Sequence, residues 1–537
     1  MKYFKTLWIA LFTVLFINAQ DTPLDFLPAD FHKGRREAVR SMMPANSVAV
    51  FFANAERNRA NDVDYVYHQD PDFYYLTGYK EPNAVLVIFS EAQENAEAKV
   101  YNEILYVQER DPAAEQWNGK RLGVEGAKQQ LGFEMAFNGG EFLKSTIDYK
   151  AFDNVLFFDF HNDFRDHRGE ADLFDLIKSF KEKTNYPSDY NATKQHLYGM
   201  IRSTDIKNSA NVAQTLGRYL NYYEELKEDE FITGFVNATD DALRGEIKEK
   251  VGLKLKANNL NSSIIGEIMN TLRETKTEAE LVLLKKAIEI SAVGQVEVMK
   301  AMHPNMSETE IQGIHEYVYK KYGAEYEGYP SIVGGGNNGC ILHYIENNKT
   351  KVGDDLVLMD LGAEYHGYTA DVTRTIPANG KFTPEQKQIY DIVYNAQEAG
   401  IKASLVGAPF QSVGEVSNKV VAEGLLALGI IAKPEEARTF FPHGTSHYLG
   451  LDVHDKGTYG PFKANTVITV EPGIYIPEGS DCDKKWWGIA VRIEDDILIT
   501  DNGPINLSAG APRTTDAIEA MMKQPSPLDD FILPRLD

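Results

Sequence analysis

The sequence predicts a two-domain protein, an N-terminal mixed α/β domain followed by a C-terminal α+β domain, and three observations support this. The chain has 537 residues, enough for two or three domains at roughly 100–200 residues each. Its composition is 43% hydrophobic and 11% aromatic, which can fill a core in each domain and excludes wholesale disorder. The hydrophobic pattern changes near residues 257–275, where we place the domain boundary.

The N-terminal domain is predicted over residues 24–257. Helical patterns such as Phe31–Met43 alternate with apolar runs that are typical of buried strands. These runs are Ser47–Ala53, Ala84–Ser90, Glu103–Gln108 and Asn154–Phe160. The stretch near 161–257 is polar and mostly helical in pattern, and we interpret it as a solvated helical insertion.

The C-terminal domain is predicted over residues 272–523, followed by a tail at 524–537 without a clear period. It begins with a strong amphipathic helix, Thr277–Met302, in which Thr277 is the N-cap and Glu280 completes a capping box. Pro304 follows the helix and ends it. Three further helices are predicted, and strands dominate at the end. The helices are Glu308–Tyr322, Pro384–Leu405 and Gln411–Leu428, and the strands lie within Val467–Thr500.

Charge and cysteine content exclude several kinds of function. The chain has 55 Lys and Arg against 79 Asp and Glu, a net charge of −24, so a phosphate backbone would be repelled and nucleic-acid binding is disfavoured. Two cysteines, Cys340 and Cys482, cannot build a disulfide scaffold or a zinc ribbon. They could pair in an oxidising compartment, but two partly buried thiols are the more common outcome.

The first residues predict a signal peptide at 1–19. A basic start with Lys2 and Lys5 precedes the apolar run Leu7–Ile17, and the small residue Ala19 stands where cleavage is expected. The run is shorter than the roughly 20 residues that span a bilayer, so we expect no stable membrane anchor. The alternatives are a buried helix or an uncleaved anchor. We expect an exported protein, periplasmic or secreted.

Two aspartates in the C-terminal domain occupy unusual positions. Asp360 lies in the apolar run Leu356–Gly362, where burial is costly unless the carboxylate is paired or binds a metal. A two-residue turn at Tyr365-His366 would place Asp360 directly opposite Asp371 on one face of a hairpin. Like charges that face each other are unfavourable, and a cation between them would reverse this. The alternative for Asp360 is a strand-end or capping residue.

Further acids and histidines share this pattern. Glu471 and Glu494 also follow apolar strand-like runs, although each alone is more often a salt-bridged structural residue. Gly444 and Gly450 place the neighbouring histidines in a loop or strand, not on a helix of the HExxH kind. The histidines are His443, His447 and His454, with His343 after a glycine-rich turn. Surface histidines in a turn are the alternative.

Oxygen donors with one imidazole favour Mn²⁺, Co²⁺, Fe²⁺ or Zn²⁺ over a metal that prefers thiolates. Two such ions that share carboxylates would hold a hydroxide at neutral pH and polarise a carbonyl. The sequence therefore predicts a hydrolase.

The order of these residues resembles that of the "pita-bread" metallopeptidases, and within them the aminopeptidase P (Xaa-Pro aminopeptidase) family. The motifs are MDLGAEYHGYTADVTRT, HGTSHYLGLDVHD, TVEPGIY and VRIEDD, and the resemblance runs from about Leu272 to Ile505. In the N-terminal domain, Asp62, the run Gln69–Gly78 and Glu115-Gln116-Trp117 match the family's leader domain. The resemblance implies a creatinase-like mixed α/β domain followed by a pita-bread catalytic domain.

The resemblance also implies residue roles. Asp371 and Glu494 would bridge two divalent ions, Mn²⁺ above all, with Asp360 on one ion and His447 and Glu471 on the other. A bridging hydroxide would attack the scissile carbonyl, and Glu471 would shuttle the proton. The remaining site residues would bind or orient the substrate and the ligands. His454 and His343 would steady the carbonyl oxygen and the leaving group, His443 would line the prolyl side, Arg492 would orient a ligand carboxylate and Tyr475 would contact the site.

The implied substrates are peptides with proline at the second position. Trp117 would reach the active site of a neighbouring subunit, so the family predicts a homo-oligomer. Three alternatives remain at this point: an Xaa-Pro dipeptidase (prolidase), a metal-free C–N hydrolase of the creatinase type, and a non-catalytic peptide-binding module on the same fold. The five filled ligand positions argue against the last two.

Overall fold

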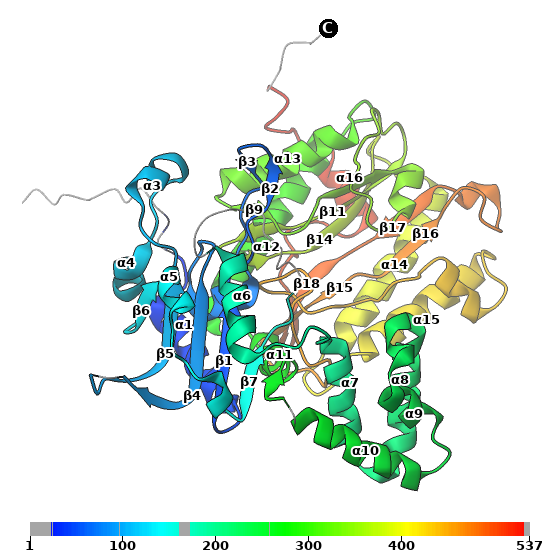
Figure 1. The fold of residues 1–537 in the computed structure, drawn as a ribbon. Helices are drawn as coiled ribbons and strands as arrows, with labels where there is room; N and C mark the ends of the chain where they lie inside the picture. The colour runs from blue at the N-terminus through cyan, green and yellow to red at the C-terminus, as the bar shows by residue number, and fades with distance from the viewer. Residues whose placement is uncertain (1–22, 24, 96, 161–171, 257, 531–537) are drawn as a thin grey trace, which may run out of the picture.

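The computed structural model describes residues 23, 25–95, 97–160, 172–256 and 258–530. An N-terminal domain, drawn in blue through cyan to green, and a C-terminal domain, drawn in green to red, lie side by side (Figure 1). The predicted signal peptide at 1–19, residues 161–171 of the predicted insertion and residues 531–537 of the tail lie outside the described residues. None of the helices in the described ranges combines the length and the apolar character that crossing a membrane requires.

The N-terminal domain is built on a six-stranded mixed sheet of order β6-β5-β4-β1-β7-β8. The central strand β1 pairs antiparallel with β4 and parallel with β7. Its residues alternate between two cores, Ala49 and Phe51 in one and Val48 and Val50 in the other, so both faces of the sheet are covered. The four predicted strands are confirmed. The strands are β1 (Ser47–Phe52), β4 (Val85–Glu94), β5 (Val100–Val107), β6 (Ala136–Asn138), β7 (Asn154–Phe157) and β8 (Leu260–Asn261), with a small separate hairpin of β2 (Asn58–Ala60) and β3 (Val63–Asp64).

Helices cover this sheet and extend beyond it. The predicted helix at Phe31–Met43 is α1 (Ala29–Met42). The other helices of this half are α2 (Pro71–Thr77), α3 (Pro112–Asn118), α4 (Gly123–Gln130), α5 (Gly139–Leu143), α6 (Leu173–Thr184), α7 (Ala192–Ser203), α8 (Ser209–Tyr222), α9 (Glu230–Asn237), α10 (Asp241–Lys256) and α11 (Ile264–Glu274). Helix α6 packs Leu176 and Phe180 against the sheet, whereas α7 to α10 enclose a core of their own that includes Leu216 and Phe235. The helical prediction for this stretch is confirmed, and its helices bury more apolar surface than a solvated insertion would.

The C-terminal domain begins as the sequence predicts. Helix α12 (Glu278–Ala301) has a complete capping box between Thr277 and Glu280. The later helices are α13 (Glu308–Lys321), α14 (Pro384–Ala403), α15 (Ser412–Ala427) and α16 (Thr515–Met521). The strands are β9 (Tyr326–Glu327), β10 (Ile332–Gly335), β11 (Leu356–Leu361), β12 (Ala363–Tyr365), β13 (Tyr368–Thr369), β14 (Val372–Pro377), β15 (Thr466–Val470), β16 (Gly473–Ile476), β17 (Ile489–Arg492), β18 (Asp495–Thr500) and β19 (Gly503–Asn506).

Two long hairpins organise these strands, and both change sheet part-way along. In the first, β11 pairs with β14 in one sheet, and β12 pairs with β13 in the next. In the second, β15 pairs with β18 and β16 pairs with β17. Because each change of sheet interrupts the ladder, residues at the breaks are free to turn their side chains inward. The four candidate carboxylates lie at or beside these two breaks.

The two domains share one hydrophobic core. Phe73 and Tyr75 of α2 belong to the same buried cluster as Leu284 of α12 and Tyr368 of the first hairpin. Both cysteines, Cys340 and Cys482, are free thiols of intermediate burial. The continuous core holds the N-terminal domain against the elements that carry the candidate site.

Candidate active site

The first hairpin brings Asp360 and Asp371 to one face, but not in the predicted register. The turn is His366-Gly367, with φ of 51° and 88°. It lies one residue later than the predicted Tyr365-His366 turn, which shifts the strand pairing by two residues. Asp360 therefore pairs with Thr373, not with Asp371. The prediction of directly opposed aspartates is wrong. Because a shift of two residues preserves the face, the two carboxylates remain diagonal neighbours.

Tyr329 joins the two aspartates. Its hydroxyl lies 2.7 Å from Asp360 Oδ1 and 2.5 Å from Asp371 Oδ1. Gly362, at the break between β11 and β12, makes the close approach of the hairpin possible. A Cβ atom at Gly362 would lie 1.8 Å from the carbonyl oxygen of Ala370, so any other residue would push the two ligand-bearing strands apart.

Antiparallel pairing of two chain segments also brings His447 and Glu471 together. Residues 445–449 run antiparallel along the edge of β15: the Thr469 amide donates to the His447 carbonyl at 3.0 Å, and the Glu471 amide donates to the Thr445 carbonyl at 2.9 Å. His447 Nε2 lies 3.5 Å from Glu471 Oε1. His447 Nδ1 is 3.1 Å from the Tyr448 carbonyl, which places the N–H on Nδ1 and leaves Nε2 to face the acids.

Glu494 completes the group from the second hairpin. The pairings Val470↔Asp495 and Gly473↔Arg492 flank the break, so Glu471 and Glu494 face each other across it. Thr373 donates a hydrogen bond of 2.6 Å to Glu494 Oε2. Ligand atoms of Asp371, His447 and Glu494 all lie within 4.8 Å of one another, and His447 Nε2 is 3.4 Å from Asp371 Oδ2.

The negative charges of this group are not fully compensated by the protein. Burial and the Asp371 and Glu471 charges raise the pKa of Glu494 well above its usual value. Burial, with the Asp371 charge adding to it against the opposing effect of His447, raises the pKa of Glu471 to about 7. Although burial acts in the opposite direction, the carboxylates of Asp371 and Glu471 raise the pKa of His447 to about 9. Each shift indicates carboxylates that lack a cation.

Arg492 makes a direct ion pair with one carboxylate of the group. Its Nη2 lies 2.5 Å from Asp360 Oδ2, and its Nη1 donates to the Tyr475 hydroxyl at 2.8 Å. Burial alone would favour a neutral Asp360, but the Arg492 guanidinium and the Tyr329 hydroxyl hold the pKa of this carboxyl below its usual range. The Tyr475 hydroxyl is also 2.7 Å from His443 Nε2. Arg492 thus fixes Asp360, and Tyr475 links Arg492 to His443.

The predicted ligands line one cleft of about 600 Å³. His343, His443 and His454 line the same cleft, and the His454 ring lies 4.4 Å from the His447 ring, edge to face. Tyr475 is buried behind His443 and is not part of the cleft wall. Trp117, at the end of α3, is 87% exposed and does not line the cleft of its own chain. Apart from Trp117, the predicted site residues converge.

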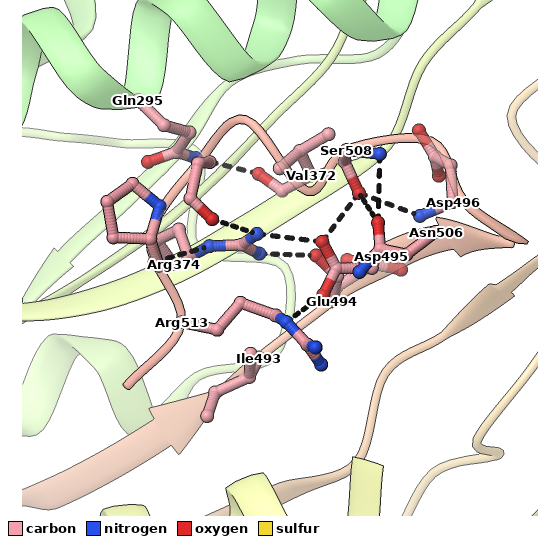
Figure 2. Close-up of polar contacts among 12 residues, drawn as sticks. Gln295, Val372, Arg374, Ile493, Glu494, Asp495, Asp496, Asn506, Ser508 and Arg513 are labelled. Atoms are coloured by element: carbon pink, nitrogen blue, oxygen red, sulfur yellow. Dashed lines mark hydrogen bonds and ion pairs between the residues drawn. The ribbon is translucent and has the colours of Figure 1, made fainter. Parts of the chain in front are cut away.

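A buried network behind Glu494 holds the second hairpin in place (Figure 2). Arg374 donates to Asp495 Oδ1 and to the Glu494 carbonyl, both at 2.7 Å. The Asp371 amide donates to Asp496 Oδ2 at 3.2 Å. Sequence reasoning missed these supporting residues, and it missed Tyr329 and Thr373. Thr373 and Arg374 follow Asp371 in the chain, which was a usable signal, whereas nothing around Tyr329 marked it.

The donor set fits a divalent metal centre. It has four carboxylates and one imidazole, a combination that suits Mn²⁺, Co²⁺, Fe²⁺ or Zn²⁺. The carboxylates converge on a common space without enough protein cations to neutralise them, and His447 directs its Nε2 there. Such an arrangement is costly for a protein alone and becomes favourable when it holds a cation.

Comparisons with known proteins agree with this geometry. The model of metallopeptidase family M24 matches residues 282–501, and the model of the aminopeptidase P N-terminal domain matches residues 32–151. The Xaa-Pro aminopeptidase of Escherichia coli K12 is 33% identical over 501 residues, which cover 91% of this chain and 96% of that protein. Two solved structures have a TM-score of 0.72. Pseudomonas aeruginosa aminopeptidase PepP is 30% identical, covering 93% of this chain and 99% of that one, and E. coli aminopeptidase P with the inhibitor Pro-Leu is 31% identical, covering 93% and 98%.

Proposed function

The chain belongs to the aminopeptidase P family of M24 metallopeptidases, and we propose that it is a metal-dependent aminopeptidase that removes the first residue from peptides with proline at the second position. The observation that carries the proposal is the convergence of Asp371, His447 and Glu494 on one space, with Asp360 and Glu471 beside them. The cleft of about 600 Å³ around these donors has room for a short peptide.

We propose two divalent ions at this centre, with Mn²⁺ the first candidate. Asp371 and Glu494 would be shared between the ions, Asp360 would serve one ion, and His447 and Glu471 would serve the other. Bound there, such ions polarise a carbonyl group and lower the pKa of water. Arg492 keeps Asp360 ionised and oriented through their 2.5 Å contact, so a ligand oxygen stays directed at the centre.

The other residues of the cleft would handle protons and substrate. Glu471 is placed to hold a proton because its two oxygens face His447 Nε2 and His443 Nδ1, each at 3.5 Å. His454 and His343, both exposed to the cleft, would contact the carbonyl oxygen and the leaving group. His443, held between the Gly444 carbonyl and Tyr475, would line the prolyl side.

Bond choice follows from the chemistry of proline. The bond before proline is a tertiary amide without an N–H, so an enzyme that relies on this donor loses a contact. A pocket shaped for a pyrrolidine ring gains an apolar contact with the proline side chain instead. Apolar side chains of Ile332, Leu342 and Val453 line the cleft beside the histidines and would suit such a ring.

A prolidase differs from this proposal in its substrate and not in its donor set. The matched relatives named above are aminopeptidases, which favours cleavage of longer peptides. A creatinase-type hydrolase and a non-catalytic binding module are disfavoured by the match to a metallopeptidase family and by the five filled donor positions. From the sequence of residues 1–19 we further propose export to the periplasm or outside the cell, and from the position of Trp117 a homo-oligomer.

One assay tests the proposal. Purified mature protein is incubated with Arg-Pro-Pro, Ala-Pro and Ala-Ala-Ala, with Mn²⁺ or with a chelator. We expect cleavage of Arg-Pro-Pro, slower cleavage of Ala-Pro, none of Ala-Ala-Ala, and complete loss with the chelator. Cleavage of Ala-Pro alone would assign a dipeptidase, and full activity in the chelator would refute the metal-dependent mechanism.

A further inference from the structure

A chain of buried charges crosses from the N-terminal domain to the loop that carries His447 and His454. We propose that Asp72 of the N-terminal domain is a positioning residue for His454, acting through Arg273 and Lys456 on the backbone of this loop. This interdomain charge network consists of Asp72, Arg273, Lys276, Asp455 and Lys456. The inference rests on the proposed function, because it assumes that His454 contacts the reacting group.

The contacts of the interdomain charge network run without a break. Arg273 donates from Nη1 to Asp72 Oδ1 at 2.7 Å and from Nη2 to Asp455 Oδ1. Lys276 donates to Asp455 Oδ2 at 3.0 Å, and Lys456 donates to Asp72 Oδ2. Asp455 and Lys456 directly follow His454 in the chain. Two separate links therefore join Asp72 to the two residues after His454, one through Arg273 to Asp455 and one directly to Lys456.

The network lies in the interior. The side chains of Asp72, Arg273, Lys276 and Asp455 are at most 5% exposed. Burial alone would raise the pKa of Asp72, but Lys456 and Arg273 hold it below its usual range. Arg273 and Lys276 likewise hold the pKa of Asp455 low against the effect of burial. Removing one carboxylate would leave a buried cation without its partner, so the remaining charges would have to move.

His454 itself depends on this anchoring. Its side chain is exposed in the cleft. Within the described ranges the imidazole forms no hydrogen bond, and it packs edge to face with the His447 ring. The position of the ring therefore depends on the loop backbone and on this ring contact. The Asp455 amide donates to the Tyr448 carbonyl at 2.9 Å, and a Cβ at Gly450 would lie 2.0 Å from Asp455 Oδ2. The loop is packed closely around the Asp455 carboxylate, so a shift of this group moves His454.

The alternative is that Asp72 only stabilises the domain interface. The other interdomain contacts separate these two roles. Asp25 of the N-terminal segment accepts hydrogen bonds from Tyr365 at 2.5 Å and from His366 Nε2 at 2.8 Å, and neither partner belongs to the His454 loop. Asp25→Asn thus weakens an interdomain carboxylate contact without touching the interdomain charge network, and it is the control for Asp72→Asn.

The experiment is a double-mutant cycle on Arg-Pro-Pro cleavage with the metal-loaded full-length mature protein. A misplaced catalytic group costs about tenfold to a hundredfold in rate, so we expect Asp72→Asn to lower kcat by about tenfold or more with KM changed by less than about threefold. The bound-metal content should match wild type. In a His454→Ala background the same substitution should lower kcat by less than about twofold, because the group that it positions is gone.

Asp25→Asn should leave kcat within about twofold of wild type. Should Asp72→Asn fail to fold, Lys456→Met takes its place, since Lys456 is 31% exposed and also links Asp72 to the loop. An unchanged kcat in Asp72→Asn and Lys456→Met overturns the inference. It is also overturned if Asp72→Asn lowers kcat by the same factor in the His454→Ala background as in wild type. If His454→Ala alone leaves kcat unchanged, the role of His454 fails and the positioning role fails with it. The peptidase proposal stands or falls separately, on the chelator control with wild type.

Discussion

Two groups of buried carboxylates adjoin the loop that carries His454 and differ in how their charge is balanced. The first is the proposed metal-binding group, Asp360, Asp371, Glu471 and Glu494. In it, the pKa of Asp371 and that of Glu494 are raised, by burial first and by neighbouring carboxylates second. In the interdomain charge network, lysine and arginine hold the pKa of Asp72 and that of Asp455 low in spite of burial. Burial is similar in the two groups, so the number of nearby cations decides the sign.

This difference in charge balance distinguishes a cation-binding site from a set of structural ion pairs. Carboxylates that the protein leaves uncompensated are costly in the folded protein and gain energy only from a cation that arrives from solution. Carboxylates that are already paired gain nothing from such a cation, and they cost energy when a partner is removed. Substitutions that neutralise one carboxylate should therefore have opposite effects on the stability of the metal-free protein in the two groups.

The largest expected effect is the loss of activity in Glu494→Gln. This residue would be shared by both ions, so we expect the variant to lose bound metal and to cleave Arg-Pro-Pro at least about a thousandfold more slowly, because metal ions supply several kcal/mol of transition-state stabilisation. Metal analysis and steady-state kinetics measure this. In chelator the variant should unfold at the same temperature as wild type or above it, since a neutral amide replaces a carboxyl whose charged form is disfavoured by burial and by its neighbours. A metal-free variant that is clearly less stable would contradict the comparison.

The next effect is on stability. Asp455→Ala leaves Arg273 and Lys276 buried without their shared partner, and breaking a buried ion pair from one side costs about 3–5 kcal/mol. We expect a lower urea midpoint for this variant in chelator as well as in Mn²⁺, because the network is independent of metal. A midpoint equal to that of wild type would place the network among contacts that contribute little.

A smaller effect concerns pH. A carboxyl whose pKa is lowered by folding adds stability that is fully present above its unfolded value of about 3.9 and is lost as the pH falls through the folded value. Asp72 and Asp455 are such groups. The stability difference between wild type and Asp455→Asn should therefore be constant from pH 7 to about pH 5 and shrink below about pH 4. Urea unfolding at these pH values in chelator measures it, and a difference that grows on acidification would reverse the assigned sign.

The sequence predicted the metal-binding group far better than the interdomain charge network. Acids within apolar runs are conspicuous because burial of a charge needs a reason, and the residues concerned lie in two hairpins. The exact register was wrong because a Tyr-His turn and a His-Gly turn differ by two residues in the pairing sum. The error did not change the face of the hairpin on which Asp360 and Asp371 lie, because side chains alternate between the two faces with period two.

The interdomain charge network had no comparable signal. Asp72, Arg273 and Asp455 are about 200 residues apart in turn, and each stands near a helix end or in a loop, where charged residues are ordinary. Their burial follows from the shared core of the two domains, which brings α2 and the end of α11 against the loop after His454. Such contacts appear only once the tertiary structure is known. Helix caps, in contrast, are local, and the box at Thr277 and Glu280 was predicted correctly.

The smallest effect sharpens the comparison at a residue that belongs to neither group. Trp117 is 87% exposed at the end of α3, so Trp117→Ala should change the free energy of unfolding by less than about 0.5 kcal/mol. Tyr222→Ala, at an 84% exposed residue of α8, is the matched control for the loss of an exposed aromatic ring. If the chain assembles as we propose, Trp117→Ala should raise KM for Arg-Pro-Pro whereas Tyr222→Ala should not. Dilution of wild type should reproduce the rise, because Trp117 does not line the cleft of its own chain and acts only from another copy. A KM that is independent of protein concentration and equal in both variants would mean that each subunit works alone. The residues that matter for catalysis would then all come from one chain.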